Sequence, residues 1–134
     1  MFFHSGHRYD YDRLIRLGGA ALVEVGNRGA TRSDQLEAAI DDQTAMMLYQ
    51  AHLDSRTDSV SIRETAEITL RHGVSLFDDA AFMNYPTDVL PGLIQAGADL
   101  VAVSAKYYGG PNSGGFVISH ASLIEAVRNV CFTN

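Results

Sequence analysis

The sequence predicts an α/β fold with a mostly parallel sheet and helical crossovers. Short apolar runs, suited to strands, alternate along the chain with longer stretches in which apolar residues recur at helical spacing. Strands separated in this way by helices pair in parallel through right-handed crossovers. A length of 134 residues suits one domain with a genuine core.

The first half of the chain contains two expected helices and two expected strands. Residues 8–17 carry apolar side chains at helical spacing and end at a glycine pair, a common helix stop. Residues 20–25 form an apolar run, and Thr31 followed by Asp34 indicates a capping box at the start of a helix. Residues 44–49 are almost continuously apolar, as in a strand covered on both faces.

The second half repeats this order. Ser61 and Glu64 form another capping box, and the helix they begin is expected to end at Gly73. Its predicted inner face consists of Ile62, Ala66, Thr69 and Leu70. The remaining expected elements are strands at 74–77, 100–103 and 116–118, a helix at 86–96, and a final helix capped by Ser122 with Glu125.

Composition excludes several classes of function. The formal net charge is −6 and no basic stripe is present, so we expect no nucleic-acid partner. The single cysteine, Cys131, excludes an internal disulfide, and no Cys/His spacing indicates a metal site. No apolar stretch suits a signal peptide or a membrane span, and we expect a cytoplasmic protein without a membrane partner.

Polar groups recur where three of the expected strands end. These groups are His52, the pair Asp78-Asp79, and Lys106. Ligands of parallel α/β sheets bind beyond the carboxyl ends of the strands, and core packing gives no reason for polar groups there. The sequence therefore predicts a binding site at this edge.

Lys106 is the only lysine of the chain. It lies between the apolar run 98–104 and the glycine-rich segment 109–115. An amine in this position can lose its proton by desolvation and attack an aldehyde carbon. The alternative is a surface lysine whose stem covers a strand end.

The side chains of Asp78 and Asp79 are expected to point to opposite faces of the sheet. Asp79 is a candidate to pair with a cationic ring nitrogen, and the alternative is a turn or capping aspartate. Asp78 remains a competitor, since successive strand residues point to opposite faces and only one of the two can serve.

The other candidates are weaker. His52 could pack on a flat cofactor or be structural, and Ser104 could donate a hydrogen bond near the lysine. The segment 109–115 either lets backbone approach a cofactor or a partner subunit, or is a hairpin or crossover turn. It is no phosphate-binding P-loop, because Lys106 precedes the glycines.

Residues 97–115, with Lys106 at their centre, resemble the cofactor-lysine segment of bacterial selenocysteine synthase (seryl-tRNA selenium transferase). They equally resemble the related D-glucosaminate-6-phosphate ammonia-lyase group. Upstream, the blocks 19–26, Thr31-Arg32 and 38–45 match the same family, and the opening 6–12 is similar to the ammonia-lyase branch.

The resemblance implies part of the large domain of the aspartate aminotransferase fold and the cofactor pyridoxal phosphate. Lys106 matches the lysine that binds the cofactor, and Asp79 matches the aspartate facing the pyridine nitrogen. Ala81, His52 and Ser104 match a small residue near the ring, a histidine after an earlier strand and a serine before the lysine. One residue separates Ser104 from Lys106, where selenocysteine synthases typically have two, which puts the role of the serine in doubt.

The resemblance also implies that residues 1–134 are only a part of such a large domain. The amino-terminal part that grips the cofactor phosphate and the carboxy-terminal small domain have no counterpart. We expect a lyase segment acting on a small-molecule amino substrate, such as an amino-sugar phosphate, within a homo-oligomer or with a complementing polypeptide. Alternatives are a selenium-transferase-like or aminotransferase-like enzyme, or a non-catalytic remnant. A dinucleotide-binding domain ranks far lower, because no Gly-x-Gly-x-x-Gly opens a helix.

Overall fold

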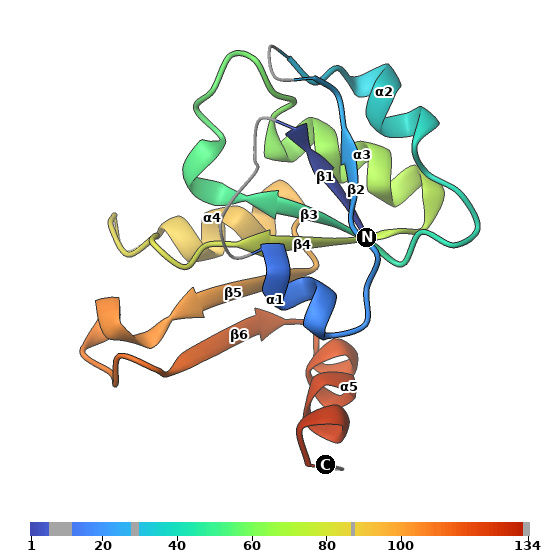
Figure 1. Ribbon diagram of the computed structural model, residues 1–134. Helices are drawn as coiled ribbons and strands as arrows, with labels where there is room; N and C mark the ends of the chain where they lie inside the picture. The colour runs from blue at the N-terminus through green and yellow to red at the C-terminus, as the bar shows by residue number, and fades with distance from the viewer. Residues whose placement is uncertain (6–11, 28–29, 87, 133–134) are drawn as a thin grey trace.

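The computed structural model describes residues 1–5, 12–27, 30–86 and 88–132. Their strands form one six-stranded sheet (Figure 1). The strand order is β2-β1-β3-β4-β5-β6; the first five of these strands run parallel, and β6 is antiparallel to β5. The strands are β1 (Phe2–His4), β2 (Val23–Val25), β3 (Met46–Gln50), β4 (Ser75–Asp79), β5 (Leu100–Ser104) and β6 (Gly115–Ser119). The predicted α/β class with a mostly parallel sheet is confirmed.

Helices lie on both sides of the sheet. They are α1 (Asp12–Leu17), α2 (Ser33–Ala38), α3 (Ile62–His72), α4 (Val89–Ala96) and α5 (Ala121–Phe132), with the 3₁₀ turns η2 (Ala51–Leu53) and η3 (Ala105–Tyr108). Figure 1 shows α3 and α4 behind the sheet, α1 in front of it, and α5 extending away beyond β6. None of residues 121–130 of α5 is buried.

The core lies between the sheet and the layer of α3 and α4. Strand residues Met47, Tyr49, Leu76 and Val101 are fully enclosed there. Apolar residues of α3 and α4 cover them, including Ile62, Ile68, Leu90 and Leu93. The opposite face of β4 and β5 is only half-buried.

Helix α3 follows the predicted capping signals closely. The Ser61 hydroxyl accepts from the backbone N–H of Glu64 (3.3 Å), and Gly73 ends the helix in the left-handed conformation at φ 65°. The predicted inner face is partly wrong: Leu70 is 81% exposed, and Thr65 and Ile68 are buried instead. The buried arc is centred on Ile62 and Thr65, which turns Leu70 toward solvent.

Two other predicted caps are displaced. Helix α2 begins after Arg32, whose backbone N–H donates to the Gln35 side chain (3.0 Å). The Thr31 hydroxyl instead donates to the carbonyl of Val25 (3.1 Å), so its side chain holds the loop against β2. Helix α5 begins at Ala121, which places Ser122 inside the helix.

Strand β1 was not predicted, because three residues are too few to show a period. The first expected helix is described from Asp12 onward, and its residues 8–11 lie outside the described part. Within the described residues, no helix has both the length and the apolar character needed to cross a membrane.

Candidate functional site

The carboxyl ends of β3, β4 and β5 lie side by side at one edge of the sheet. Asp79, the last residue of β4, is level with Gln50 of β3 on one side and Ala102 of β5 on the other. His52 follows β3 in η2 and Lys106 follows β5 in η3, so the three predicted groups come from adjacent strands.

Asp78 and Asp79 point to opposite faces, as their alternation predicted. Asp79 is half-buried on the face away from α3 and α4, and its Oδ1 accepts from the backbone N–H of Ala81 (3.0 Å). Asp78 is completely enclosed on the helix-covered face. Only Asp79 therefore reaches the open face of the sheet.

Enclosure changes the chemistry of Asp78. Burial, and then the charge of Asp79, raise the pKa of Asp78 to about 8, against a smaller opposing effect of the backbone N–H of Ala51. At neutral pH this carboxyl is therefore mostly protonated, and it is unsuited to stabilise a cation.

A hydrogen-bonded cluster next to Asp78 fixes the end of β3. Asp54 Oδ1 accepts from the Tyr49 hydroxyl (2.6 Å) and from the backbone N–H of Ile62 (2.8 Å), at the start of α3. Burial and this hydrogen bond raise the pKa of the Tyr49 phenol far above its ordinary value. Asp54 was not predicted as a cap because it lies eight residues before Ile62.

Lys106 is exposed, as in the second of its two alternatives, a surface lysine at a strand end. Its Nζ lies 5.0 Å from the ring centroid of Tyr107. The described residues leave the amine uncovered because η3 extends past the last paired residues of β4 and β5. Desolvation of the amine needs a covering group.

Aromatic rings connect the ends of the three strands. The ring of Phe82, in the loop after β4, makes edge contacts with His52 (centroids 5.4 Å apart) and with Tyr107 (6.0 Å). The same loop holds η3 by a hydrogen bond from the Tyr108 hydroxyl to the carbonyl of Met83 (2.8 Å). Phe82 has no polar group, so the recurrence of polar residues at strand ends gives no signal for it.

The other predicted residues lie at the same edge. Ala81 lies two residues after Asp79 and is half-buried, and Ser104 is the last residue of β5, level with Gly115 of β6. The structure thus brings His52, Asp79, Ala81, Ser104 and Lys106 to adjacent strand ends.

The glycine-rich segment is the hairpin connection between β5 and β6, one of the two alternatives. A Cβ at Gly110 would lie 2.7 Å from the Cβ of Ala105, and one at Gly115 would lie 2.9 Å from the carbonyl of Val103. These glycines therefore permit the close return of the chain.

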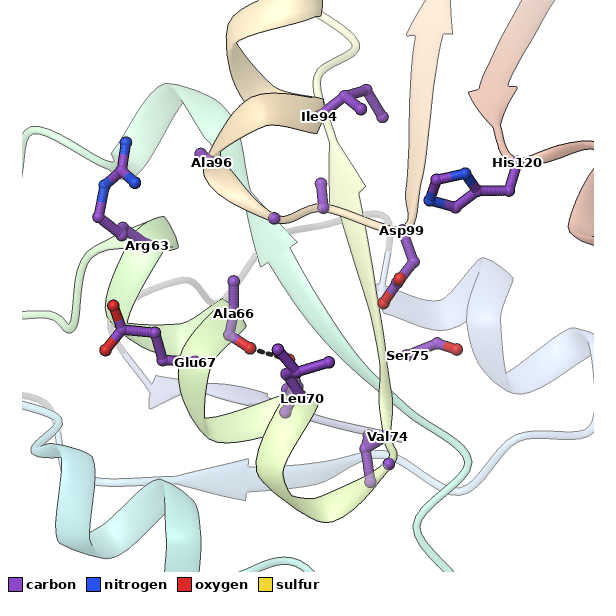
Figure 2. Close-up of a pocket in the computed structure, with 14 residues that line it drawn as sticks. Arg63, Ala66, Glu67, Leu70, Val74, Ser75, Ile94, Ala96, Asp99 and His120 are labelled. Carbon is purple, nitrogen blue, oxygen red and sulfur yellow. Dashed lines mark hydrogen bonds between the residues drawn. The ribbon is translucent and has the colours of Figure 1, made fainter.

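A cavity of about 490 Å³ lies at the opposite edge (Figure 2). Ser75, Asp99 and His120 line it where β4 and β5 begin, and Ala66 and Leu70 of α3 lie across from them. It contains none of the predicted site residues. In the described ranges, no three His, Cys, Asp or Glu side chains are grouped to hold a metal ion.

Known proteins match nearly the whole chain. The family model "L-seryl-tRNA selenium transferase" (SelA) matches residues 6–133. A D-glucosaminate-6-phosphate ammonia lyase of Salmonella typhimurium is 34% identical over 92% of this chain and 34% of its own length. An L-seryl-tRNA(Sec) selenium transferase of Serratia proteamaculans is 32% identical over 86% of this chain and 28% of its own length. The chain thus spans about a third of the curated relatives it matches.

Solved structures show the same fold. A D-glucosaminate-6-phosphate ammonia-lyase superposes with a TM-score of 0.84 at 32% identity, over 95% of this chain and 35% of that one. A sphingosine-1-phosphate lyase of Burkholderia pseudomallei gives a TM-score of 0.67 at 17% identity, over 91% of this chain and 31% of that one. The expected fold, a mostly parallel α/β sheet of the aminotransferase type, is confirmed.

Proposed function

Because the chain belongs to the L-seryl-tRNA selenium transferase (SelA) family, we propose that it is part of a pyridoxal-phosphate enzyme. The reaction we favour is a lyase reaction on a small amino substrate, such as an amino-sugar phosphate. The observation that carries the proposal is the convergence of an amine, a carboxylate and an imidazole on three adjacent strand ends. Similarity to the ammonia-lyase in both sequence and structure supports the choice of reaction.

The residues at this edge fit the cofactor chemically. Lys106 is the only side-chain amine of the chain and would bind the aldehyde carbon of the cofactor. Asp79 would hold a proton on the pyridine nitrogen, since its carboxylate reaches the open face. His52 would orient the ring by packing on it, and Ala81 would leave space beside it. Ser104 would donate a hydrogen bond near the lysine.

When bound, pyridoxal phosphate supplies an electron sink for the substrate carbon. The Nζ of Lys106, once released, would accept the proton from the substrate Cα. Asp79 would retain its proton-holding role throughout, whereas the neutral, enclosed Asp78 has no access to the reacting groups.

Completion of the site by groups outside residues 1–134 is part of the proposal. The chain spans about a third of its relatives' length, and Lys106 is exposed. We propose that residues 1–134 act as part of a large domain, and that further residues of the same polypeptide, a homo-oligomeric neighbour or a complementing polypeptide shield the amine.

A spectrophotometric titration of the chain with pyridoxal phosphate tests the proposal. We expect a visible band of lysine-bound cofactor that Lys106→Arg abolishes, since arginine keeps the charge but supplies no nucleophile. Asp79→Asn should weaken or shift the band, and Asp78→Asn should not. Ammonia release from D-glucosaminate 6-phosphate then tests the reaction. Absence of any band at saturating cofactor, in the complete assembly as well as in the chain alone, would support the non-catalytic remnant.

Selenium transfer on seryl-tRNA is the second candidate, favoured by the family model itself. A net charge of −6 argues against tRNA binding by this part of the protein. A filter-binding assay with tRNA distinguishes the two candidate functions. Salt-sensitive binding of tRNA would favour an RNA-linked substrate over a small amino substrate, and it would overturn our expectation of no nucleic-acid partner.

A further inference from the structure

We propose that the ring of Tyr107, which packs against Phe82, binds the free ammonium group of Lys106 through a cation–π contact. We call the Tyr107 ring the holding site of this amine. The functional meaning of this holding site rests on the proposed role of Lys106 as the cofactor-binding amine. Tyr107 acts on the amine alone and is therefore a positioning residue.

The contact between the two side chains has the geometry of a cation–π interaction. The Nζ of Lys106 lies 5.0 Å from the ring centroid of Tyr107, within the reach of about 6 Å at which an ammonium is attracted to an aromatic face. Both side chains are exposed, so the contact between the amine and the ring lies at the surface of this edge.

The Tyr107 ring is itself held in place. The Phe82 ring meets it at an interplanar angle of 61°, with centroids 6.0 Å apart. The Asn84 amide donates to the carbonyl of Tyr107 (3.5 Å), and the Tyr108 hydroxyl donates to the carbonyl of Met83 (2.8 Å). The loop that follows Asp79 therefore fixes the element that carries Lys106.

Holding the ammonium matters because the proposed reaction needs the lysine both bound and free. An amine bonded to the aldehyde carbon no longer presents an ammonium to the ring, so Tyr107 stabilises the released lysine relative to the bound one. An exposed cation–π contact changes the equilibrium constant between the released and the bound lysine by about two- to fivefold. Loss of the ring should therefore tighten, not weaken, covalent binding of pyridoxal phosphate by about that factor.

The single lysine makes the contact directly observable without cofactor. In protein labelled with ¹³C-lysine, one set of side-chain signals arises, and the ring of Tyr107 should shift the Hε signal upfield relative to the urea-unfolded chain. Tyr107→Leu should abolish this shift, and Tyr107→Phe should retain it. Tyr85→Leu is the matched control, because Tyr85 is 81% exposed in the same loop region. A wild-type signal at the unfolded position, or an unchanged shift in Tyr107→Leu, overturns the proposal.

Titration with pyridoxal phosphate provides the second measurement. We expect a two- to fivefold lower dissociation constant for Tyr107→Leu, restored to the wild-type value in Tyr107→Phe. Weaker binding in Tyr107→Leu would overturn the holding role. A wild-type protein with the upfield shift but no cofactor band, even in its complete assembly, would refute the proposed function and leave the amine–ring contact established.

Discussion

At the scale of single residues, Asp78 and Asp79 show how strand alternation separates two identical side chains. Neighbours in sequence, they differ because one faces the layer of α3 and α4 and the other faces the open side. Sequence could predict that only one of them serves a ligand. It could not predict which, since the choice depends on where the helices pack.

Asp78 should make the stability of the protein depend on pH. Its pKa is raised from 3.8 to about 8 in the folded state, so the folded chain retains a proton that the unfolded chain loses. Retention of this proton stabilises the folded chain fully below pH about 4. The stabilisation is lost as the pH rises from there through about 8, and the total loss in the free energy of unfolding is on the order of 5 kcal/mol. Asp78→Asn should flatten this decline. Urea unfolding between pH 4 and 9 measures it; equal slopes in both proteins would contradict the assignment.

The surroundings of Lys106 could not be decided from its neighbours in the sequence. Its position after an apolar strand was visible, and the structure does place it beyond β5. The exposure of the Lys106 side chain depends on which groups cover η3, and those groups would lie outside residues 98–115.

At the scale of elements, α4 ends in close contact with α3. Gly97 ends α4 at φ 112°, and a Cβ there would lie 2.5 Å from the Cβ of Ala66. Two constraints therefore require glycine at this position: the left-handed backbone and the contact with α3.

Gly97→Ala should lower the free energy of unfolding by about 2 kcal/mol or more, since strain and overlap add. Gly92→Ala is the matched control: it lies within the same helix with nothing within 4 Å of the added Cβ. Helix propensity predicts that the control is stabilised by up to about 1 kcal/mol. Chemical denaturation measures both, and a neutral Gly97→Ala would show that α3 can move aside.

Helix ends were predictable where one side chain does the capping. Ser61 and Gly73 bracket α3 as expected, because the hydroxyl and the left-handed glycine act within one turn. The prediction that Thr31 caps α2 was wrong because its hydroxyl donates a hydrogen bond to the carbonyl of Val25 in β2 instead. Only the folded chain provides this contact. Capping by Asp54 likewise depends on the path of the loop before α3.

At the scale of the whole molecule, strand β6 is an exposed edge of the sheet. Phe116 and Val117 are each more than a third exposed, and β6 pairs only with β5 among the described strands. Unpaired edges with apolar side chains favour association with another chain.

Val117→Lys should therefore reduce self-association, because a charge on an edge strand opposes pairing between chains. Sedimentation velocity over a range of protein concentrations measures the effect. Val130→Lys provides the control, since Val130 is exposed on α5 and is no part of the edge strand. Equal reduction by both variants would point to net charge instead of the edge.

The overall architecture was predictable because its signal is repeated. Five of the six strands, from β2 to β6, coincide with expected apolar runs, and the alternation with helices predicted parallel pairing. The antiparallel direction of β6 follows from its short hairpin connection, which the glycines permit. The convergence of three strand ends could be predicted as well, but the aromatic contacts of Phe82 could not.

The place of β1 has a consequence for how the sheet assembles. Residues 2–4 pair with β2 on one side and with β3 on the other, so this ladder is complete only once residues 46–50 have joined it. The buried Phe3 and His4 therefore reach their final surroundings only after a segment more than 40 residues further along the chain has folded against them.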